Sequence, residues 1–188
     1  MLMDWDISVG SGCCIIMDLV VEMNNIELCR ARSGDEKILA YIQTESWKAA
    51  FSGILSSEEL ERSTDLEKAE SMYRNVLSQD FVNLVIEYVD RSPHCIAGWS
   101  QNRSDLGANV AELICIHSLC DQWHQGYGSI MMHHILDDIK EKGYSEVILW
   151  VFEKNRNARR FYEKHGFGST SLKNQSHGAI EIMYSKRL

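Results

Sequence analysis

The stretch Gln125-Gly126-Tyr127-Gly128-Ser129 joins an apolar segment, residues 113–119, to an amphipathic pattern that continues to Lys142. An apolar run of strand length followed by helical periodicity predicts a strand, a glycine turn and a helix. The first N–H groups of a helix have no intrahelical acceptor, and the helix dipole adds a partial positive charge beside them. The turn therefore predicts a binding site for a phosphorylated ligand.

Two common glycine-rich phosphate sites do not fit this turn. A dinucleotide fingerprint needs a third small residue three positions after the second glycine, where this chain has Met131. A P-loop needs Gly-Lys-Ser or Gly-Lys-Thr, and neither triplet occurs in the chain. The remaining interpretation is a pyrophosphate-binding turn that is neither a dinucleotide fingerprint nor a P-loop.

The composition is that of one ordinary globular domain: 188 residues, 45% hydrophobic and 24% charged. The net charge of −8 argues against nucleic acid or an anionic membrane as a partner, and favours a cationic or neutral substrate. The six cysteines show no Cys-x-x-Cys spacing, which predicts reduced, buried thiols and fits a cytoplasmic protein.

The first 24 residues contain no Lys or Arg, and their apolar runs are broken. This pattern excludes a signal peptide and a transmembrane helix. We expect residues 1–22 to be an extension of upstream or expression-derived origin, followed by a single domain over residues 23–188. The alternative is that residues 13–17 add a short strand to that domain.

Periodicity predicts the elements of the domain in order. The first half contains a strand at 26–32, a helix at 35–51, a helical region between 56 and 77, and strands at 81–88, 95–101 and 110–119. The second half contains the helix ending at 142, a strand at 147–152, a helix from 155, and strands at 168–172 and 179–185. Because strands first follow one another and then alternate with helices, we expect a mixed α/β sheet.

Three segments resemble the GNAT N-acetyltransferases. The longest runs from residues 149–151 through Asn155-x-x-Ala158-x-x-Phe161-Tyr162-Glu163-Lys164-x-Gly166-Phe167 and is similar to the acetyl-CoA-binding half of that family. Residues 111–113, leading to the Gly126-Tyr127-Gly128 turn, resemble the preceding motif, and residues 45–55 resemble a first-helix signature. The resemblance covers residues 26–188. It implies the GNAT fold, a mixed, mostly antiparallel central sheet with splayed central strands, flanked by helices.

The resemblance also implies an activity. We expect an acetyl-CoA-dependent N-acetyltransferase that moves an acetyl group to a primary amine of a small molecule or peptide, by direct attack in a ternary complex. The rival interpretation is a non-catalytic module that binds or senses acyl-CoA. Family members often pair, so a homodimer is one expectation. No metal site is expected, because the adjacent His133 and His134 would point about 100° apart on a helix.

In the family, acetyl-CoA lies where the strand before the glycine turn splays from the strand after its helix. By this resemblance the pantetheine arm would meet the backbone of Ile116, His117, Ser118 and Leu119. The pyrophosphate would meet N–H groups of His124, Gln125, Gly126, Tyr127, Gly128 and Ser129. The following helix would contribute Asn155, Ala158, Phe161 and Tyr162, with helix capping as a second role for Asn155. Trp123 departs from the family pattern, which usually has Arg or Gln at that position.

Two residues, Glu112 and His117, are candidates for the general base. Glu112 lies in an apolar strand pattern that would raise a carboxyl pKa, and its spacing resembles that of a family catalytic glutamate; the alternative is a solvated strand-end carboxylate. His117 titrates near neutrality, and its alternative is a packed strand histidine.

For the general acid we expect Tyr162, which the family places beside the CoA sulfur; the alternative is a core aromatic. A backbone N–H near His117 or Ser118 would stabilise the oxyanion if that strand is bulged. Trp47 and Phe51 are expected either to shape the acceptor pocket or to be core residues.

Overall fold

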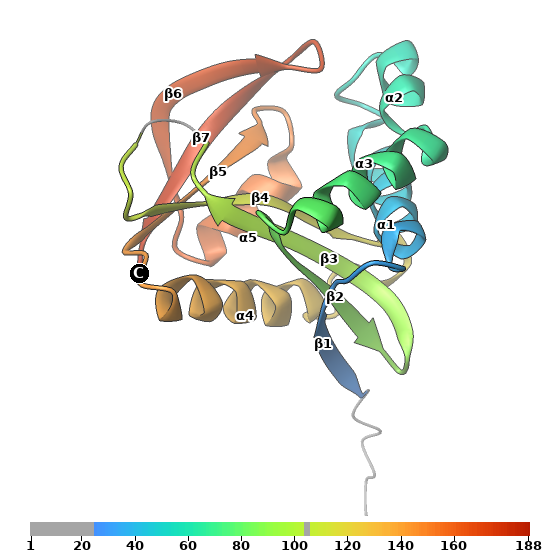
Figure 1. The fold of residues 1–188 in the computed structure, drawn as a ribbon. Coiled ribbons are helices and arrows are strands. Elements are labelled where there is room, and N and C mark those ends of the chain that lie inside the picture. Colours follow the sequence, from blue (N-terminus) through green and yellow to red (C-terminus); the bar gives the residue numbers. More distant parts are fainter. Residues whose placement is uncertain (1–24, 104–105) are drawn as a thin grey trace, which may run out of the picture.

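The computed structural model describes residues 25–103 and 106–188. Both expectations for residues 1–22, an extension or a short added strand, lie outside these residues. The segment from Asn25 onward folds as one sheet with helices on both faces (Figure 1).

The sheet has seven strands in the order β1-β2-β3-β4-β5-β7-β6. All neighbours are antiparallel except β4 and β5, which are parallel. This arrangement confirms the mixed, mostly antiparallel sheet. The strands are β1 (Ile26–Arg30), β2 (Asn83–Val89), β3 (Ser92–Gln101), β4 (Val110–Ser118), β5 (Glu146–Phe152), β6 (Gly168–Ser176) and β7 (Ala179–Arg187).

The helical region expected between residues 56 and 77 is two helices. Each begins at its own cap: the Ser56 side chain accepts from Glu59 N, and the Asp65 side chain accepts from Lys68 N. The helices are α1 (Glu36–Phe51), α2 (Ser57–Ser63), α3 (Leu66–Gln79), α4 (Tyr127–Glu141) and α5 (Arg156–Lys164), with a 3-10 turn η1 (Cys120–Gln122) before α4.

Two apolar cores lie on opposite faces of the sheet. The larger one packs α4 and α5 on one face, where α4 buries residues at helical spacing: Tyr127, Met131, Met132, Ile135, Leu136 and Ile139. The smaller one packs α1 and α3 on the other face, around Leu39, Ile42 and Tyr73. Figure 1 shows α4 running along one side of the sheet, with α1 and α3 across from it.

A β-bulge interrupts β4 beside β3. Gly98 pairs with Cys115 and Trp99 pairs with Leu113, so Ile114 is the extra residue. Gly98 has no room for a side chain, because a Cβ there would lie 2.8 Å from the Leu84 Cδ2 atom. A side chain at this position would require the Leu84 side chain to move.

The described cysteines bear out only part of the sequence interpretation. Cys29, Cys95, Cys115 and Cys120 are all free thiols, but Cys29 and Cys120 are exposed rather than buried. Across the described parts of the chain, no helix has both the length and the apolar character needed to cross a membrane.

Candidate functional site

The central feature of the site is the place where β4 and β5 separate. Their parallel pairing covers only Val110–Leu113 against Glu146–Leu149, four residues on each strand. Beyond it, within the described sheet, residues 115–118 pair only with β3 and residues 150–152 only with β7, while Ile114 is unpaired in the bulge. Unpaired strand edges can hold an extended ligand through backbone hydrogen bonds. The splay expected from the sequence is therefore present.

The glycine turn lies at the open end of this splay. Gly126 precedes α4 with a φ of 95°, and His124 also has a left-handed φ, 66°. The Ser129 N–H donates to the Gly126 carbonyl at 2.9 Å, whereas the N–H groups of Gly126 and Gly128 have no acceptor among the described residues. Left-handed residues next to a helix start make backbone N–H groups converge on an anion. The turn therefore suits a phosphate, as expected, although the Ser129 N–H is already engaged.

Trp123 has a structural role in the loop between β4 and α4. Its indole Nε1–H donates to the Ser118 carbonyl at 3.1 Å. The next backbone donor, the Leu119 N–H, bonds to the His94 carbonyl at 3.0 Å. Since the Ser118 carbonyl and Leu119 N–H already have partners, the strip of β4 best placed for a pantetheine arm is residues 114–117.

Helix α5 forms the other wall beside the turn. The Asn155 side chain accepts from the Ala158 N–H at 3.1 Å, which confirms its role as a helix cap. The Phe161 ring lies 3.5 Å from the position that a Gly128 Cβ would take, which is an ordinary van der Waals contact between α4 and α5. Tyr162 is buried in the same core, against which Ile116 packs.

The Tyr162 hydroxyl has a distinctive environment. Burial raises the pKa of Tyr162 well above its usual range. The hydroxyl has no hydrogen-bond partner among residues 25–103 and 106–188. It therefore stays protonated at physiological pH, with its proton available to a ligand.

Glu112 is buried and fully engaged by an arginine. The Arg103 backbone N–H and Nε–H donate to Glu112 Oε2 at 3.0 and 3.1 Å, and the Arg103 Nη2 lies 2.5 Å from Oε1. Only 2% of Glu112 is exposed, so the alternative of a solvated strand-end carboxylate is wrong. Both carboxylate oxygens are occupied by one guanidinium and its backbone.

His117 faces α1 and is held by Trp47. The Trp47 Nε1–H donates to His117 Nε2 at 3.4 Å, which makes Nε2 the unprotonated nitrogen. Burial lowers the pKa of His117 to about 4, so the ring is neutral at physiological pH. The bulge lies at Ile114, three residues before the position at which an oxyanion donor was expected.

Aromatic rings from α1, β5 and the β6–β7 turn meet on the face of the sheet opposite α4. We call Trp47, Phe51, Phe152 and His177 the aromatic wall. Ring centroids lie 5.0 Å apart for Trp47 and Phe51, 4.9 Å for Phe51 and Phe152, and 5.1 Å for Trp47 and His177. The two residues expected to shape an acceptor pocket are thus brought together with partners from β5 and the β6–β7 turn.

A pocket of about 410 Å³ opens on the same face, next to the splay. We call it the carboxylate pocket because Glu112 and Glu181 line it, one neutralised by Arg103 and the other without an ion-pair partner among the described residues. Burial raises the pKa of Glu181 above its usual range. The pocket is lined by Arg103, Glu112, Ile114, Trp150, Asn174, Ser176 and Glu181.

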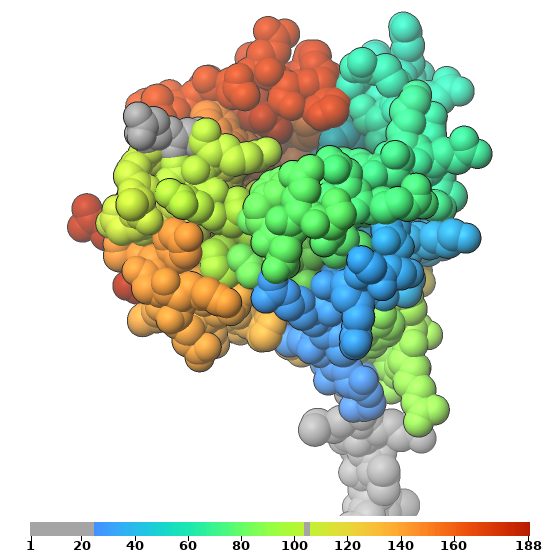
Figure 2. Space-filling model, viewed as in Figure 1, coloured from blue at the N-terminus to red at the C-terminus, as the bar shows by residue number. Residues whose placement is uncertain are grey.

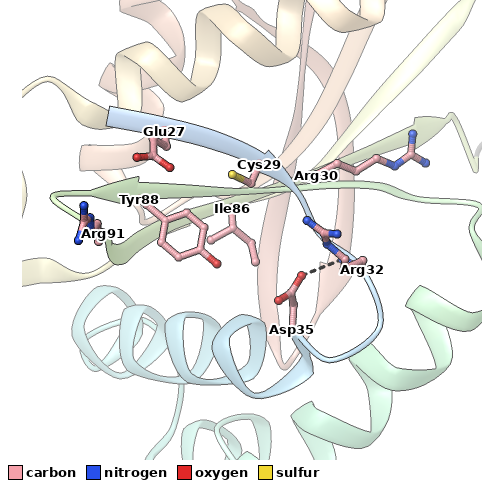
Figure 3. Close-up of a pocket in the computed structure, with 8 residues that line it drawn as sticks. All are labelled: Glu27, Cys29, Arg30, Arg32, Asp35, Ile86, Tyr88 and Arg91. Atoms are coloured by element: carbon pink, nitrogen blue, oxygen red, sulfur yellow. Dashed lines mark hydrogen bonds between the residues drawn. The ribbon is translucent and has the colours of Figure 1, made fainter. Parts of the chain in front are cut away.

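A second hollow, of about 300 Å³, lies over β1 and β2 near the start of α1 (Figure 3). Its side chains carry both signs of charge, and the Arg32 N–H donates to the Asp35 carboxylate at 2.9 Å. It contains none of the residues of the splay, and its lining is Glu27, Cys29, Arg30, Arg32, Asp35, Ile86, Tyr88 and Arg91.

Some site residues could not be found from the sequence pattern. Arg103 follows β3 in a polar loop, and Glu181 is a single acidic residue in an otherwise apolar strand pattern. The turn between β6 and β7 does have a local sequence feature, the glycine that follows His177. In the structure both residues are left-handed and form a two-residue hairpin turn, in which glycine is common. Among residues 25–103 and 106–188, no group of His, Cys, Asp or Glu side chains is arranged to hold a metal.

Comparison with known proteins gives a consistent result. A model of the acetyltransferase (GNAT) family matches residues 44–167. Spermidine N(1)-acetyltransferase of Thermoplasma acidophilum is 26% identical over 144 residues, which cover 76% of this chain and 88% of that protein.

Solved structures share the fold at lower identity. PaiA N-acetyltransferase of Thermoplasma acidophilum, in complex with coenzyme A, has a TM-score of 0.72 at 23% identity, covering 87% of this chain and 99% of that one. Ribosomal-protein-alanine N-acetyltransferase of Brucella melitensis has a TM-score of 0.67 at 16% identity, covering 86% and 99%. YncA of Salmonella typhimurium, with acetyl-CoA, has a TM-score of 0.65 at 14% identity, covering 86% and 93%.

Proposed function

The chain belongs to the GNAT family of acetyltransferases and is an N-acetyltransferase; from this we propose that it moves the acetyl group of acetyl-CoA to a primary amine of a small polyamine, by direct attack in a ternary complex. The observation that carries the proposal is the interrupted pairing of β4 and β5 beside the carboxylate pocket. One ligand can occupy the splay while the other approaches from the opposite face.

The acceptor site favours a slender cation. Glu181 offers a carboxylate, and the aromatic wall offers ring faces that attract ammonium groups. The net charge of −8 favours the approach of a polycation. The relative that acts on spermidine supports the same substrate class. A peptide acceptor and a homodimer stay predictions, and the free thiols support a cytoplasmic location.

Acetyl-CoA would be held mainly by backbone. Residues 114–117 would pair with the pantetheine amides, and the N–H groups of Gly126 and Gly128 would meet the pyrophosphate. The amine nitrogen attacks the thioester carbonyl, the carbon–sulfur bond breaks, and the Tyr162 hydroxyl gives its proton to the departing thiolate. No covalent enzyme intermediate is required.

The activity is tested by measuring thiol release with acetyl-CoA and a panel of amines that includes spermidine, an amino acid and a peptide. We expect release with the polyamine and much less with the peptide. If calorimetry shows that acetyl-CoA binds but no amine yields thiol, the rival interpretation of a binding or sensing module is correct.

The role of Tyr162 is tested by the substitution Tyr162→Phe. Removal of the hydroxyl should lower kcat by about 10²-fold, the usual contribution of a general acid, with acetyl-CoA affinity retained. Tyr41→Phe is the matched control, because Tyr41 is exposed on α1 and should leave kcat unchanged. A Tyr162→Phe variant with full kcat shows that the phenol is only a core aromatic.

A further inference from the structure

Glu181 lies beside the splay on the face that carries the acceptor pocket. It is the cross-strand partner of Phe152, so the two side chains share a face of the sheet. Phe152 belongs to the part of β5 that β4 has left, and its ring packs on Phe51 of α1 at 4.9 Å. A carboxylate at this position therefore borders the splay that the proposed acetyl-CoA site occupies.

The two carboxylates of the pocket, Glu112 and Glu181, differ in their hydrogen-bond partners. Arg103 occupies both oxygens of Glu112 with three hydrogen bonds. The Glu181 carboxylate makes no hydrogen bond or ion pair with any residue that the structure describes, although the residue is partly buried. An acidic group without a partner in a partly buried pocket is available to a cationic ligand.

The surroundings of Glu181 come from three elements besides its own strand. His177 faces it from the β6–β7 turn, Arg103 from the loop after β3, and Glu112 from β4. Desolvation is the largest influence and raises the pKa of Glu181, and Glu112 acts in the same direction, while His177 and Arg103 oppose it. A carboxylate whose pKa is raised above its ordinary value is a stronger proton acceptor than an ordinary carboxylate.

We propose that Glu181, rather than Glu112 or His117, binds the ammonium group of the acceptor and takes its proton before attack. This rests on the function proposed above. The ammonium nitrogen gives one proton to the Glu181 carboxylate, which later releases it to solvent. The freed lone pair forms the new carbon–nitrogen bond as the carbon–sulfur bond breaks. The nitrogen then loses its second proton, which balances the one that Tyr162 gives to sulfur.

The test compares Glu181→Gln with wild type using a polyamine acceptor and pH profiles of kcat/KM. At pH 7 the variant should lose about 10²-fold to 10³-fold in kcat/KM, within the range for a general base. The loss should shrink as pH rises toward the amine pKa of about 10.4, because free amine then needs no base. Glu146→Gln is the matched control, a β5 carboxylate at the paired end of the strand.

A second acceptor separates proton transfer from mere binding. Trifluoroethylamine is largely uncharged at neutral pH, so Glu181→Gln should acetylate it at nearly the wild-type rate. Equal losses with both acceptors, or no loss with the polyamine, would overturn the proposal. If wild type releases thiol with no amine at all, the proposed function itself has failed.

Folding of the variant is checked by its thermal midpoint and its CoA affinity. If Glu181→Gln does not fold, Glu181→Asp decides, because it keeps a carboxylate but moves it by one methylene. A drop in kcat of at least tenfold with the acidic limb of the pH profile retained supports the proposal, and an unchanged kcat overturns it.

Discussion

Glu87 is a single buried residue with an unusual environment. It lies on β2 opposite Cys95, on the face packed against α4, and it is fully buried. Neither carboxylate oxygen has a hydrogen-bond partner among the described residues. Burial raises the pKa of Glu87 to about 7. Because burial disfavours the charged form of a carboxyl, the folded protein favours the protonated form of Glu87.

The environment of Glu87 predicts a pH-dependent stability. The unfolded carboxyl titrates near 4.5 and the folded one near 7, so the folded state binds more protons between these values. The contribution of Glu87 to the free energy of unfolding should therefore be most favourable below pH 4.5 and be lost as pH rises through 7. Glu87→Gln should remove this loss and stabilise the protein at pH 8 by on the order of 3 kcal/mol.

Urea unfolding at pH 4.5 and pH 8 measures this effect. The stability gain from Glu87→Gln should appear at pH 8 and be small at pH 4.5. Glu27→Gln, on the exposed part of β1, is the control and should change little at either pH. A gain of the same size at both values would mean that ionisation of Glu87 is not the cause.

Single residues also show where sequence reasoning stops. The glycine turn before α4 and the Asn155 cap could be predicted because each belongs to one continuous motif, and the role expected of Tyr162 stays a prediction. The Arg103–Glu112 pair and Glu181 could not, because they meet only after strands distant in the sequence pair with one another. The bulge at Ile114 has the same origin, since it depends on the register with β3.

The β6–β7 hairpin contacts both α1 and α2 through its turn. His177 and Gly178 form its two-residue turn, with φ values of 50° and 72°. The His177 Nδ1 lies 2.7 Å from Glu59 Oε1 of α2, and the Ser63 hydroxyl lies 3.2 Å from the same nitrogen. Figure 2 shows the red surface of the hairpin meeting the teal surface of α2. Strands near the C-terminus are thus fastened to a helix near the N-terminus.

This contact predicts a pH dependence opposite to that of Glu87. Hydrogen bonding to His177, and then to Arg62, lowers the pKa of Glu59 to about 2 from an ordinary value of 4.5. The stability that Glu59 contributes is therefore present above pH 4.5 and is lost as pH falls toward 2. Glu59→Gln should lower the thermal midpoint at pH 6, with a smaller effect at pH 3.

The neighbouring acid supplies the control for Glu59. Glu58→Gln changes the same turn of α2 but an exposed side chain, so its effect should not follow this pH trend. Thermal midpoints of both variants between pH 2.5 and pH 6 give the comparison. A difference between Glu59→Gln and wild type that does not shrink in acid would contradict the assignment.

At the scale of the whole molecule, the two parts of the sheet are joined by a short interface. Within the described sheet, the strand pairing that joins β1–β4 to β5–β7 consists of four residues on each of β4 and β5. A ligand that bridges the splay binds the folded state alone, so it must stabilise the protein. CoA at one hundred times its Kd should add about 2.7 kcal/mol to the free energy of unfolding.

Two matched glycine variants test whether the glycine turn carries that stabilisation. Gly126 and Gly143 flank α4 with φ values of 95° and 88°, so alanine introduces similar backbone strain at either end. Both variants should lower the thermal midpoint without ligand. Only Gly126→Ala should also lose the rise produced by CoA, and an undiminished rise would place the pyrophosphate elsewhere.

The extra residue in β4 changes which side chains of this strand lie on the same face of the sheet. In a regular strand, even and odd positions point to opposite faces, so Glu112 and His117 would be separated by the sheet. Ile114 changes the parity: Leu113 and Ile116 both face the α4 core, while Glu112 and His117 share the acceptor face. Loss of one codon in this stretch would therefore exchange the two faces downstream. The number of residues in β4, and not only their types, decides which side chains line each face of the sheet.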